Sequence, residues 1–113
     1  MDHCEVPRWM LLKSQISNLT YSSFFEQYKS DKKAMLLDVR TKEEFDAESV
    51  EGAYNLDYLS HQLADDLEQL DPSKKYYIFC KTGRRSLRVC VLLKNMGYEA
   101  INLEGGLISG YPS

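Results

Sequence analysis

The sequence has no long hydrophobic run, few cysteines and no obvious targeting signal. No stretch of about 18 apolar residues occurs in the 113 residues, which excludes a transmembrane helix. The first five residues include two acidic ones, Asp2 and Glu5, and no long apolar core follows them, so we expect no secretory signal. The three cysteines are an odd number without the spacing of a disulfide framework, and they favour free thiols in a reducing compartment. We therefore expect a cytoplasmic protein.

Internal repeats, linkers and low-complexity stretches are also absent. A chain of 113 residues has the length of one domain. It can bury roughly two-thirds of its unfolded surface, which is enough for one core without disulfides or metals. Residues 1–18 show no clear hydrophobic period. We expect them to form an N-terminal arm in front of a single domain at residues 19–113.

Acidic residues are missing from one part of the chain, although the net charge is -3. Residues 72–98 contain seven basic residues and no acidic one, whereas residues 38–71 contain 11 acidic and two basic ones. The basic block surrounds Cys80 and would attract an anion. Alternatively, the two blocks interleave in space and their fields partly cancel. No motif indicates nucleic-acid binding.

Short apolar runs alternate with helical patterns along the chain. Because such alternation is typical of parallel sheets, we predict an α/β fold whose parallel sheet has four to five strands and helices on both faces. A capping box at Thr41 and Glu44 opens one helix, and Ser60 is predicted to cap another. The predicted strands are residues 35–39, 53–56, 76–79 and 100–103, and the predicted helices begin near residues 20–22, 41, 60 and 84.

The most informative segment is residues 80–86, which places a thiol between a strand and a helix. Cys80 follows the apolar run 76–79, and a short loop with Gly83 leads into the helix. Successive backbone N–H groups of such a turn can point into one bowl that favours an anion. Together with nearby cations, these N–H groups favour the thiolate. The segment predicts an activated sulfur nucleophile, against the alternative that Cys80 is a small buried core residue.

This loop resembles that of the rhodanese-like sulfurtransferases, which often reads Cys-x-x-Gly-x-Arg-Ser. Two further segments support the resemblance: Leu-Leu-Asp-Val-Arg followed by Glu-Glu-Phe at residues 36–45, and Asn-Leu-Glu-Gly-Gly at residues 102–106. The resemblance extends from about Leu19 to Ile108. One segment departs from the pattern, because residues 48–53 lack the His and Pro that the family often has there.

The resemblance implies a single-domain sulfurtransferase in which Cys80 carries a persulfide. Cys80 would take sulfane sulfur from thiosulfate or a protein persulfide and pass it to a thiol or cyanide. No cofactor or metal is implied, and the oligomeric state stays open. Asp38 and Arg40 would support neighbouring loops, although an Arg40–Glu44 pair at helical spacing is an equal alternative. The residues expected to contact the substrate are Lys81, Thr82, Gly83, Arg84, Arg85 and Ser86.

Two other functions stay open. Phosphatases and arsenate reductases related to the family have one more residue in this loop and commonly a His before the cysteine. Here four residues separate Cys80 from Arg85 and Phe79 precedes the thiol, which favours sulfur over phosphate. The other alternative is a binding or carrier module that delivers sulfur only to a dedicated protein.

Several single residues have more specific expectations. Gly83 is expected to adopt a backbone conformation that other residues avoid. Arg85 should support the loop, while Arg84 faces solvent or substrate. Cys90 shares a helix face with apolar residues and should pack in the core, although a resolving role with Cys80 is an alternative. We assign no role to Cys4.

Overall fold

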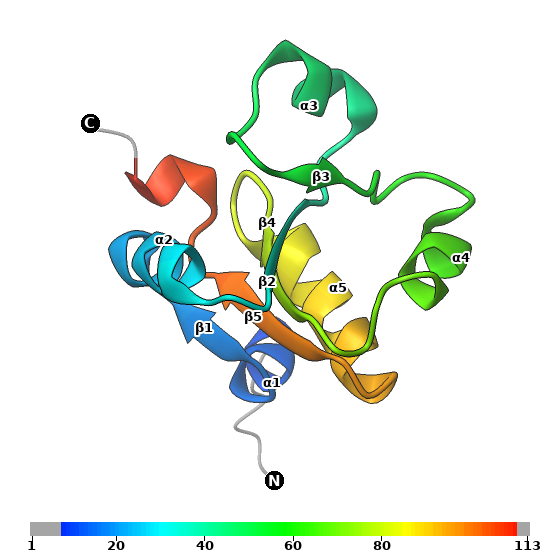
Figure 1. Ribbon diagram of the computed structural model, residues 1–113, viewed down its shortest axis with the longest axis horizontal. Coiled ribbons are helices and arrows are strands. Elements are labelled where there is room, and N and C mark those ends of the chain that lie inside the picture. Colours follow the sequence, from blue (N-terminus) through cyan, green and yellow to red (C-terminus); the bar gives the residue numbers. More distant parts are fainter. Residues whose placement is uncertain (1–7, 111–113) are drawn as a thin grey trace, which may run out of the picture.

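A computed structural model describes residues 8–110 and shows a five-stranded sheet at the centre of the protein (Figure 1). The strand order is β1-β5-β4-β2-β3, and every pair of neighbours is parallel. The predicted parallel α/β sheet is therefore confirmed. The strands are β1 (Ser17–Leu19), β2 (Ala34–Asp38), β3 (Tyr54–Asn55), β4 (Lys75–Phe79) and β5 (Glu99–Leu103). The helices are α1 (Arg8–Ser14), α2 (Tyr21–Ser30), α3 (Lys42–Ala47), α4 (Leu63–Glu68), α5 (Arg84–Asn95) and the 3-10 helix η1 (Leu107–Gly110).

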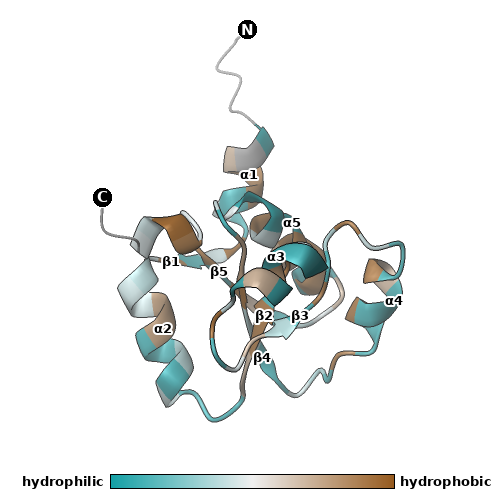
Figure 2. Cartoon of the chain, turned by 90° about the horizontal axis from the view of Figure 1, so that it is seen from above, coloured by the Kyte–Doolittle hydropathy of each residue, from teal (hydrophilic) through white to brown (hydrophobic). Residues whose placement is uncertain are grey.

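Helices cover both faces of the sheet because its central strands are apolar on both faces. Along β4, Tyr76 and Ile78 belong to one core cluster, and Tyr77 and Phe79 belong to the other. This alternation follows from the two-residue period of a strand. The first cluster includes α5 side chains and the second includes Phe24 of α2, so α5 and α2 lie on opposite sides of the strands (Figure 2). The uninterrupted apolar run of β4 is typical of a parallel strand buried on both faces.

The predicted arm is wrong for residues 8–18. These residues form α1 and β1, and β1 pairs with β5 in the register Ser17 to Ile101. Ile16, between α1 and β1, is buried in the core, and Asn18 donates hydrogen bonds to the carbonyl oxygens of Lys13 and Ile16. A three-residue strand is too short to show a hydrophobic period, and its partner lies far away in the sequence. Residues 1–7 of the predicted arm lie outside the described residues.

The ends of two helices test the capping predictions. The capping box of α3 is confirmed: Thr41 Oγ1 accepts from the Glu44 N–H, and Glu44 Oε1 accepts from the Thr41 N–H at 3.1 Å. The predicted cap at Ser60 is wrong, because α4 begins only at Leu63. Ser60 Oγ instead accepts from the N–H of Gln62 and forms a turn before the helix. Such local side-chain bonds compete with a helical start.

A glycine turn after β5 holds the loop that follows β4. The Leu107 N–H donates to the Cys80 carbonyl at 2.9 Å, and the Ile108 N–H donates to the Lys81 carbonyl at 3.1 Å. Gly106 has a φ of +69°, and a Cβ atom there would lie 2.2 Å from the Lys81 carbonyl oxygen. Only glycine can therefore bring the two backbones together. Among the described residues, no helix is long and apolar enough to cross a bilayer.

We expect Gly106→Ala to lower the free energy of unfolding by about 3 kcal/mol or more, since it adds a steric clash to an unfavourable φ. Gly97→Ala is the matched control. Gly97 also has a positive φ (+93°), but a Cβ atom there would meet nothing within 4 Å. That variant should lose only about 1 kcal/mol. Urea denaturation measures both losses, and equal losses would show that the turn can move away from the loop at no cost.

Candidate active site

Cys80 lies directly after β4, at the carboxyl edge of the sheet, with a relative exposure of 2%. In parallel α/β sheets this edge is where ligands bind. β4 lies between β5 and β2, so the loop that follows it is flanked by residues from both neighbouring strands. The loop leads at once into α5, whose first residue is Arg84. The predicted position of the thiol, at a strand-to-helix turn, is confirmed.

Backbone N–H groups converge on the sulfur atom, as predicted for the bowl. The Gly83 N–H donates to Cys80 Sγ at 3.0 Å, and the Ser86 N–H donates to it at 3.5 Å. The Ser86 hydroxyl lies 3.4 Å from Sγ, and Ser86 is fully buried. Hydrogen bonds of this kind stabilise negative charge on sulfur. Two backbone donors of the loop and the Ser86 hydroxyl thus surround the one sulfur atom.

Gly83 adopts the unusual backbone conformation that was predicted for it. Its φ is +90°, in the left-handed region, and it stands immediately before the first turn of α5. A Cβ atom there would also lie 3.0 Å from the Gly105 nitrogen and 3.1 Å from the Leu103 carbonyl oxygen. Both the φ and the close packing explain why a glycine occupies this position. With this conformation the Gly83 N–H points to Cys80 Sγ.

The two arginines at the start of α5 have different surroundings. Arg85 Nη1 donates to Glu44 Oε1 of α3 at 3.3 Å, so it connects the loop to a neighbouring helix as expected. Arg84 is exposed, as are Lys81 and Thr82 in the loop. Because both partners of the Arg85–Glu44 pair are more than one-third exposed, the pair adds little stability. The pair instead fixes the position of the Arg85 side chain against α3.

The Arg85–Glu44 pair also bears on the charge asymmetry of the sequence. It brings one residue of the basic block against one of the acidic block, so their charges partly cancel beside the loop. The pKa of Glu44 is lowered, mainly because its carboxylate accepts the Thr41 N–H and less because Arg85 lies near it. Glu44 therefore stays ionised at neutral pH and keeps its bond to Arg85.

Asp38 and Arg40 form a buried brace at the end of β2. The Asp38 side chain is completely buried and accepts from the Arg40 N–H, from the Arg40 guanidinium at 2.8 Å and from Ser49 Oγ at 2.7 Å. Arg40 also donates to the carbonyl oxygen of Glu48. The ion pair of Arg40 is thus with Asp38, and Glu44 of the alternative Arg40–Glu44 pair is bonded to Arg85. The brace holds residues 48–49 near the carboxyl edge of the sheet.

The comparison with known proteins agrees with this geometry. The family model for the rhodanese-like domain matches residues 23–109. The chain belongs to the rhodanese-like family. One relative is YtwF of Bacillus subtilis (strain 168), which is 28% identical over 95 residues; the match covers 84% of this chain and 90% of YtwF.

A longer relative is uba4 of Sclerotinia sclerotiorum, named adenylyltransferase and sulfurtransferase. It is 30% identical over 84 residues, but the match covers 66% of this chain and only 18% of uba4. YtwF also has sulfurtransferase in its name. Among solved structures, a rhodanese-like domain protein from Staphylococcus aureus superposes with a TM-score of 0.74 at 26% identity, covering 87% of this chain and 94% of that one. The rhodanese-like fold and a relationship to sulfurtransferases are therefore shown.

The brace contacts the segment in which the sequence departs from the family's usual pattern. Residues 48–53 lack the family's common His and Pro, yet the Ser49 hydroxyl is bound by Asp38 and the Glu48 carbonyl by Arg40. The segment is thus positioned by hydrogen bonds from β2.

Sequence reasoning missed three residues that shape the site. The sequence places Glu44 in a capping box and in an alternative pair with Arg40, but it does not predict the bond of Glu44 to Arg85. Asn102 and Gly106 were noticed only as letters of a motif. Asn102 is buried and donates to the Gly83 carbonyl at 3.4 Å and to Asn18 Oδ1 at 2.9 Å. For Asn102 and Gly106 the available signal was the motif at residues 102–106, which does not show the atoms that each residue contacts.

Cys90 packs in the core, as predicted. It is fully buried in the same cluster as Cys80. Burial raises the pKa of the Cys90 thiol, and the nearby Cys80 raises it further, so Cys90 stays protonated at neutral pH. Cys4 lies outside the described residues. Within residues 8–110, no group of three or more His, Cys, Asp or Glu side chains could hold a metal ion.

We expect Arg40→Gln to lower the free energy of unfolding by about 3 kcal/mol, because it leaves the buried Asp38 carboxylate without its cation. Lys42→Gln is the matched control, since Lys42 forms an exposed pair with Asp46. That variant should unfold at the same urea concentration as the wild type within error. Equal midpoints for the two variants would contradict a stabilising role of the brace.

Proposed function

We propose that the protein is a sulfurtransferase that carries sulfane sulfur as a persulfide on Cys80. The observation that carries the proposal is the pair of N–H donors to Sγ, from Gly83 and Ser86, with the Ser86 hydroxyl 3.4 Å from the same atom. The membership of the rhodanese-like family supports it. Donors directed at Sγ stabilise the thiolate that attacks the sulfur donor, and they stabilise it again when discharge of the persulfide restores it.

The proposed reaction has two steps. In the first, the Cys80 thiolate attacks the sulfane sulfur of thiosulfate; a new S–S bond forms, the S–S bond of the donor breaks, and sulfite leaves with the electron pair. In the second, cyanide or a thiolate attacks the outer sulfur of the persulfide, and the electron pair of the broken bond returns to Sγ. Both steps are nucleophilic displacements at sulfur, and the free thiolate is restored.

The loop residues have separate roles in this scheme. The outer persulfide sulfur would lie about 2 Å beyond Sγ of the buried Cys80. Lys81 and Thr82 are the exposed residues that follow Cys80 in the loop, and they would contact the donor and acceptor. Arg84 would attract the anionic donor, whereas Arg85 keeps the loop against α3 through Glu44. The scheme needs a free thiol, which suits a reducing compartment such as the cytoplasm.

A carrier that serves only a dedicated protein is the second candidate. Uba4 is a longer protein of which this chain matches 18%, and its name combines two activities. A rhodanese-like segment of such a protein could receive sulfur from one protein and give it to another. A phosphatase is less well supported, because the loop has four residues between Cys80 and Arg85 and its donors point to Sγ.

Incubation of the reduced protein with thiosulfate should add one sulfur, about 32 Da, to its intact mass. The gain should be absent in Cys80→Ser and should be removed by cyanide. Cys90→Ser is the matched control and should still gain the mass, since Cys90 is buried and protonated. A gain only with a cysteine-desulfurase persulfide would support the dedicated carrier. Turnover of a phosphate ester that requires Cys80, without any sulfur gain, would overturn the sulfurtransferase proposal.

Ser86→Ala should slow thiocyanate formation roughly tenfold. It removes one of the groups that stabilise negative charge on Sγ, and a hydrogen bond to a charged group is worth about 1.5–3 kcal/mol. Ser30→Ala, at an exposed serine of α2, is the control and should keep the wild-type rate. An unchanged rate in Ser86→Ala would mean that the backbone N–H groups alone stabilise the sulfur anion.

A further inference from the structure

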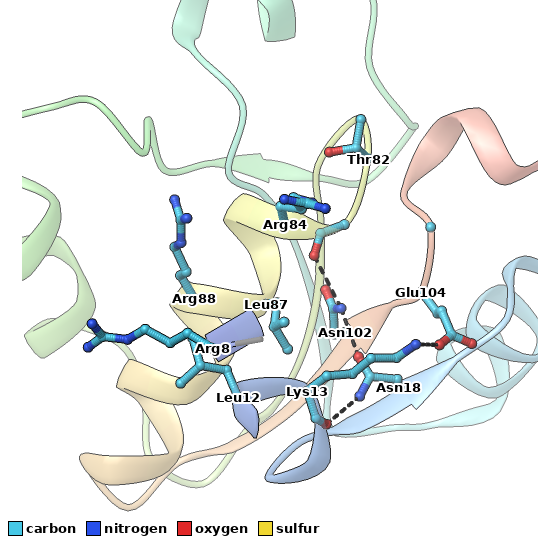
Figure 3. A pocket seen from close by; sticks show the side chains of 12 residues that line it. Arg8, Leu12, Lys13, Asn18, Thr82, Arg84, Leu87, Arg88, Asn102 and Glu104 are labelled. Carbon is cyan, nitrogen blue, oxygen red and sulfur yellow. Dashed lines mark hydrogen bonds and ion pairs between the residues drawn. The ribbon is translucent and has the colours of Figure 1, made fainter. Parts of the chain in front are cut away.

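A cavity of about 630 Å³ lies beside the Cys80 loop (Figure 3). Its walls come from α1, from the first two turns of α5 and from the carboxyl ends of β1 and β5. Thr82 and Gly83 of the loop line it, whereas Cys80 does not. Its size is within the range of small-molecule sites, which are usually about 300–1,000 Å³. It is therefore a separate space that shares one wall with the sulfur site.

The walls combine an apolar surface with guanidinium groups. Leu12 of α1 and Leu87 of α5 lie in the middle of the view, and Arg8, Arg84 and Arg88 extend around them (Figure 3). Arg84 and Arg88 are one helical turn apart on the same face of α5, and Arg8 belongs to α1. Guanidinium groups from two helices thus border one apolar wall.

The opposite side of the cavity is already neutral. Lys13 forms an ion pair with Glu104, and Asn18 bonds to Asn102 and to the Lys13 carbonyl (Figure 3). Charge that can attract a ligand is thus concentrated on the side of Arg8 and Arg88. An elongated ligand would place its charged end there and its apolar part against Leu12 and Leu87.

The cavity is also connected to the sulfur site through one residue. The Gly83 carbonyl accepts from Asn102, which lines the cavity, while the Gly83 N–H donates to Cys80 Sγ. Asn102 Oδ1 is buried and has no hydrogen-bond partner among the described residues. A ligand in the cavity would therefore contact the residue that supplies the shortest hydrogen bond to the sulfur.

We propose that this cavity binds a small amphipathic carboxylate, with its carboxylate on the guanidinium groups of α1 and α5 and its apolar chain on Leu12 and Leu87. Guanidinium groups bind carboxylates through paired N–H donors. An inorganic anion would not use the apolar wall, and a neutral molecule would not use the arginines. Cys80 does not line the cavity, so this ligand is proposed in addition to the sulfur donor, with Thr82 and Arg84 bordering both.

Titration of the reduced, ¹⁵N-labelled full-length protein with hexanoate tests the proposal. Saturable chemical-shift changes should centre on the amides of Asn18, Gly83 and Leu87. Hexanol, which has the same chain without the charge, and acetate, which has the charge without the chain, should each bind at least tenfold more weakly. Equal affinity for hexanoate and hexanol, or shift changes centred elsewhere, would overturn the proposal.

Charge-reversal variants test the role of the arginines. Arg88→Glu should weaken hexanoate binding at least tenfold, whereas Lys32→Glu should change it less than twofold. Lys32 is the matched control because it is exposed in the turn before β2, at the opposite end of the sheet. An unchanged affinity in Arg88→Glu would contradict the site. Since no sulfur donor is present, a failure here leaves the Cys80 persulfide proposal intact.

Discussion

The structure depends on one constraint: the peptide groups of the loop after β4 must direct N–H donors to Cys80 Sγ. This orientation is possible because the carbonyl oxygens of the loop are bound on its other side. The Cys80 and Lys81 carbonyls accept from the first residues of η1, and the Gly83 carbonyl accepts from Asn102. A loop whose carbonyl groups were free could rotate its peptides away from the sulfur. The conformation is thus held by partners from β5 and the glycine turn after it.

The surrounding elements support that loop from two sides. On one side, Glu44 of α3 binds Arg85, and the buried Asp38–Arg40 brace holds the segment that follows α3. On the other side, α1 and β1 complete the sheet edge and form the wall of a cavity that the loop shares. The two consecutive arginines at the start of α5 belong to these two sides, Arg85 to the side of α3 and Arg84 to the cavity. The proposed chemistry and the proposed ligand site therefore share Thr82, Gly83 and Arg84 of this region, whereas Cys80 belongs to the chemistry alone and Arg8 and Arg88 belong to the cavity alone.

Much of the fold could be predicted because its signals are local. The apolar run of β4, the capping box of α3 and the position of Gly83 all follow from neighbouring residues, and the structure confirms them. Predictions failed where a distant contact or a competing bond decides the outcome. Residues 8–18 fold against α5 and β5, and Ser60 closes a turn in place of a helix. In the site, the residues of the loop were predicted. The contacts of Glu44 with Arg85, of Asn102 with Gly83 and of Gly106 with Lys81 were not predicted.

The sequence by itself determined the chemistry that is available: a thiol at a strand-to-helix turn, separated from Arg85 by four residues, within an alternating α/β chain. These properties depend on residue order over a few positions, which the sequence records directly. Only the tertiary structure decided which N–H groups reach the sulfur, which acid binds Arg85 and that a cavity opens beside the loop. Those properties depend on distances between segments that are far apart in the chain. Packing sets these distances, and no local pattern contains them.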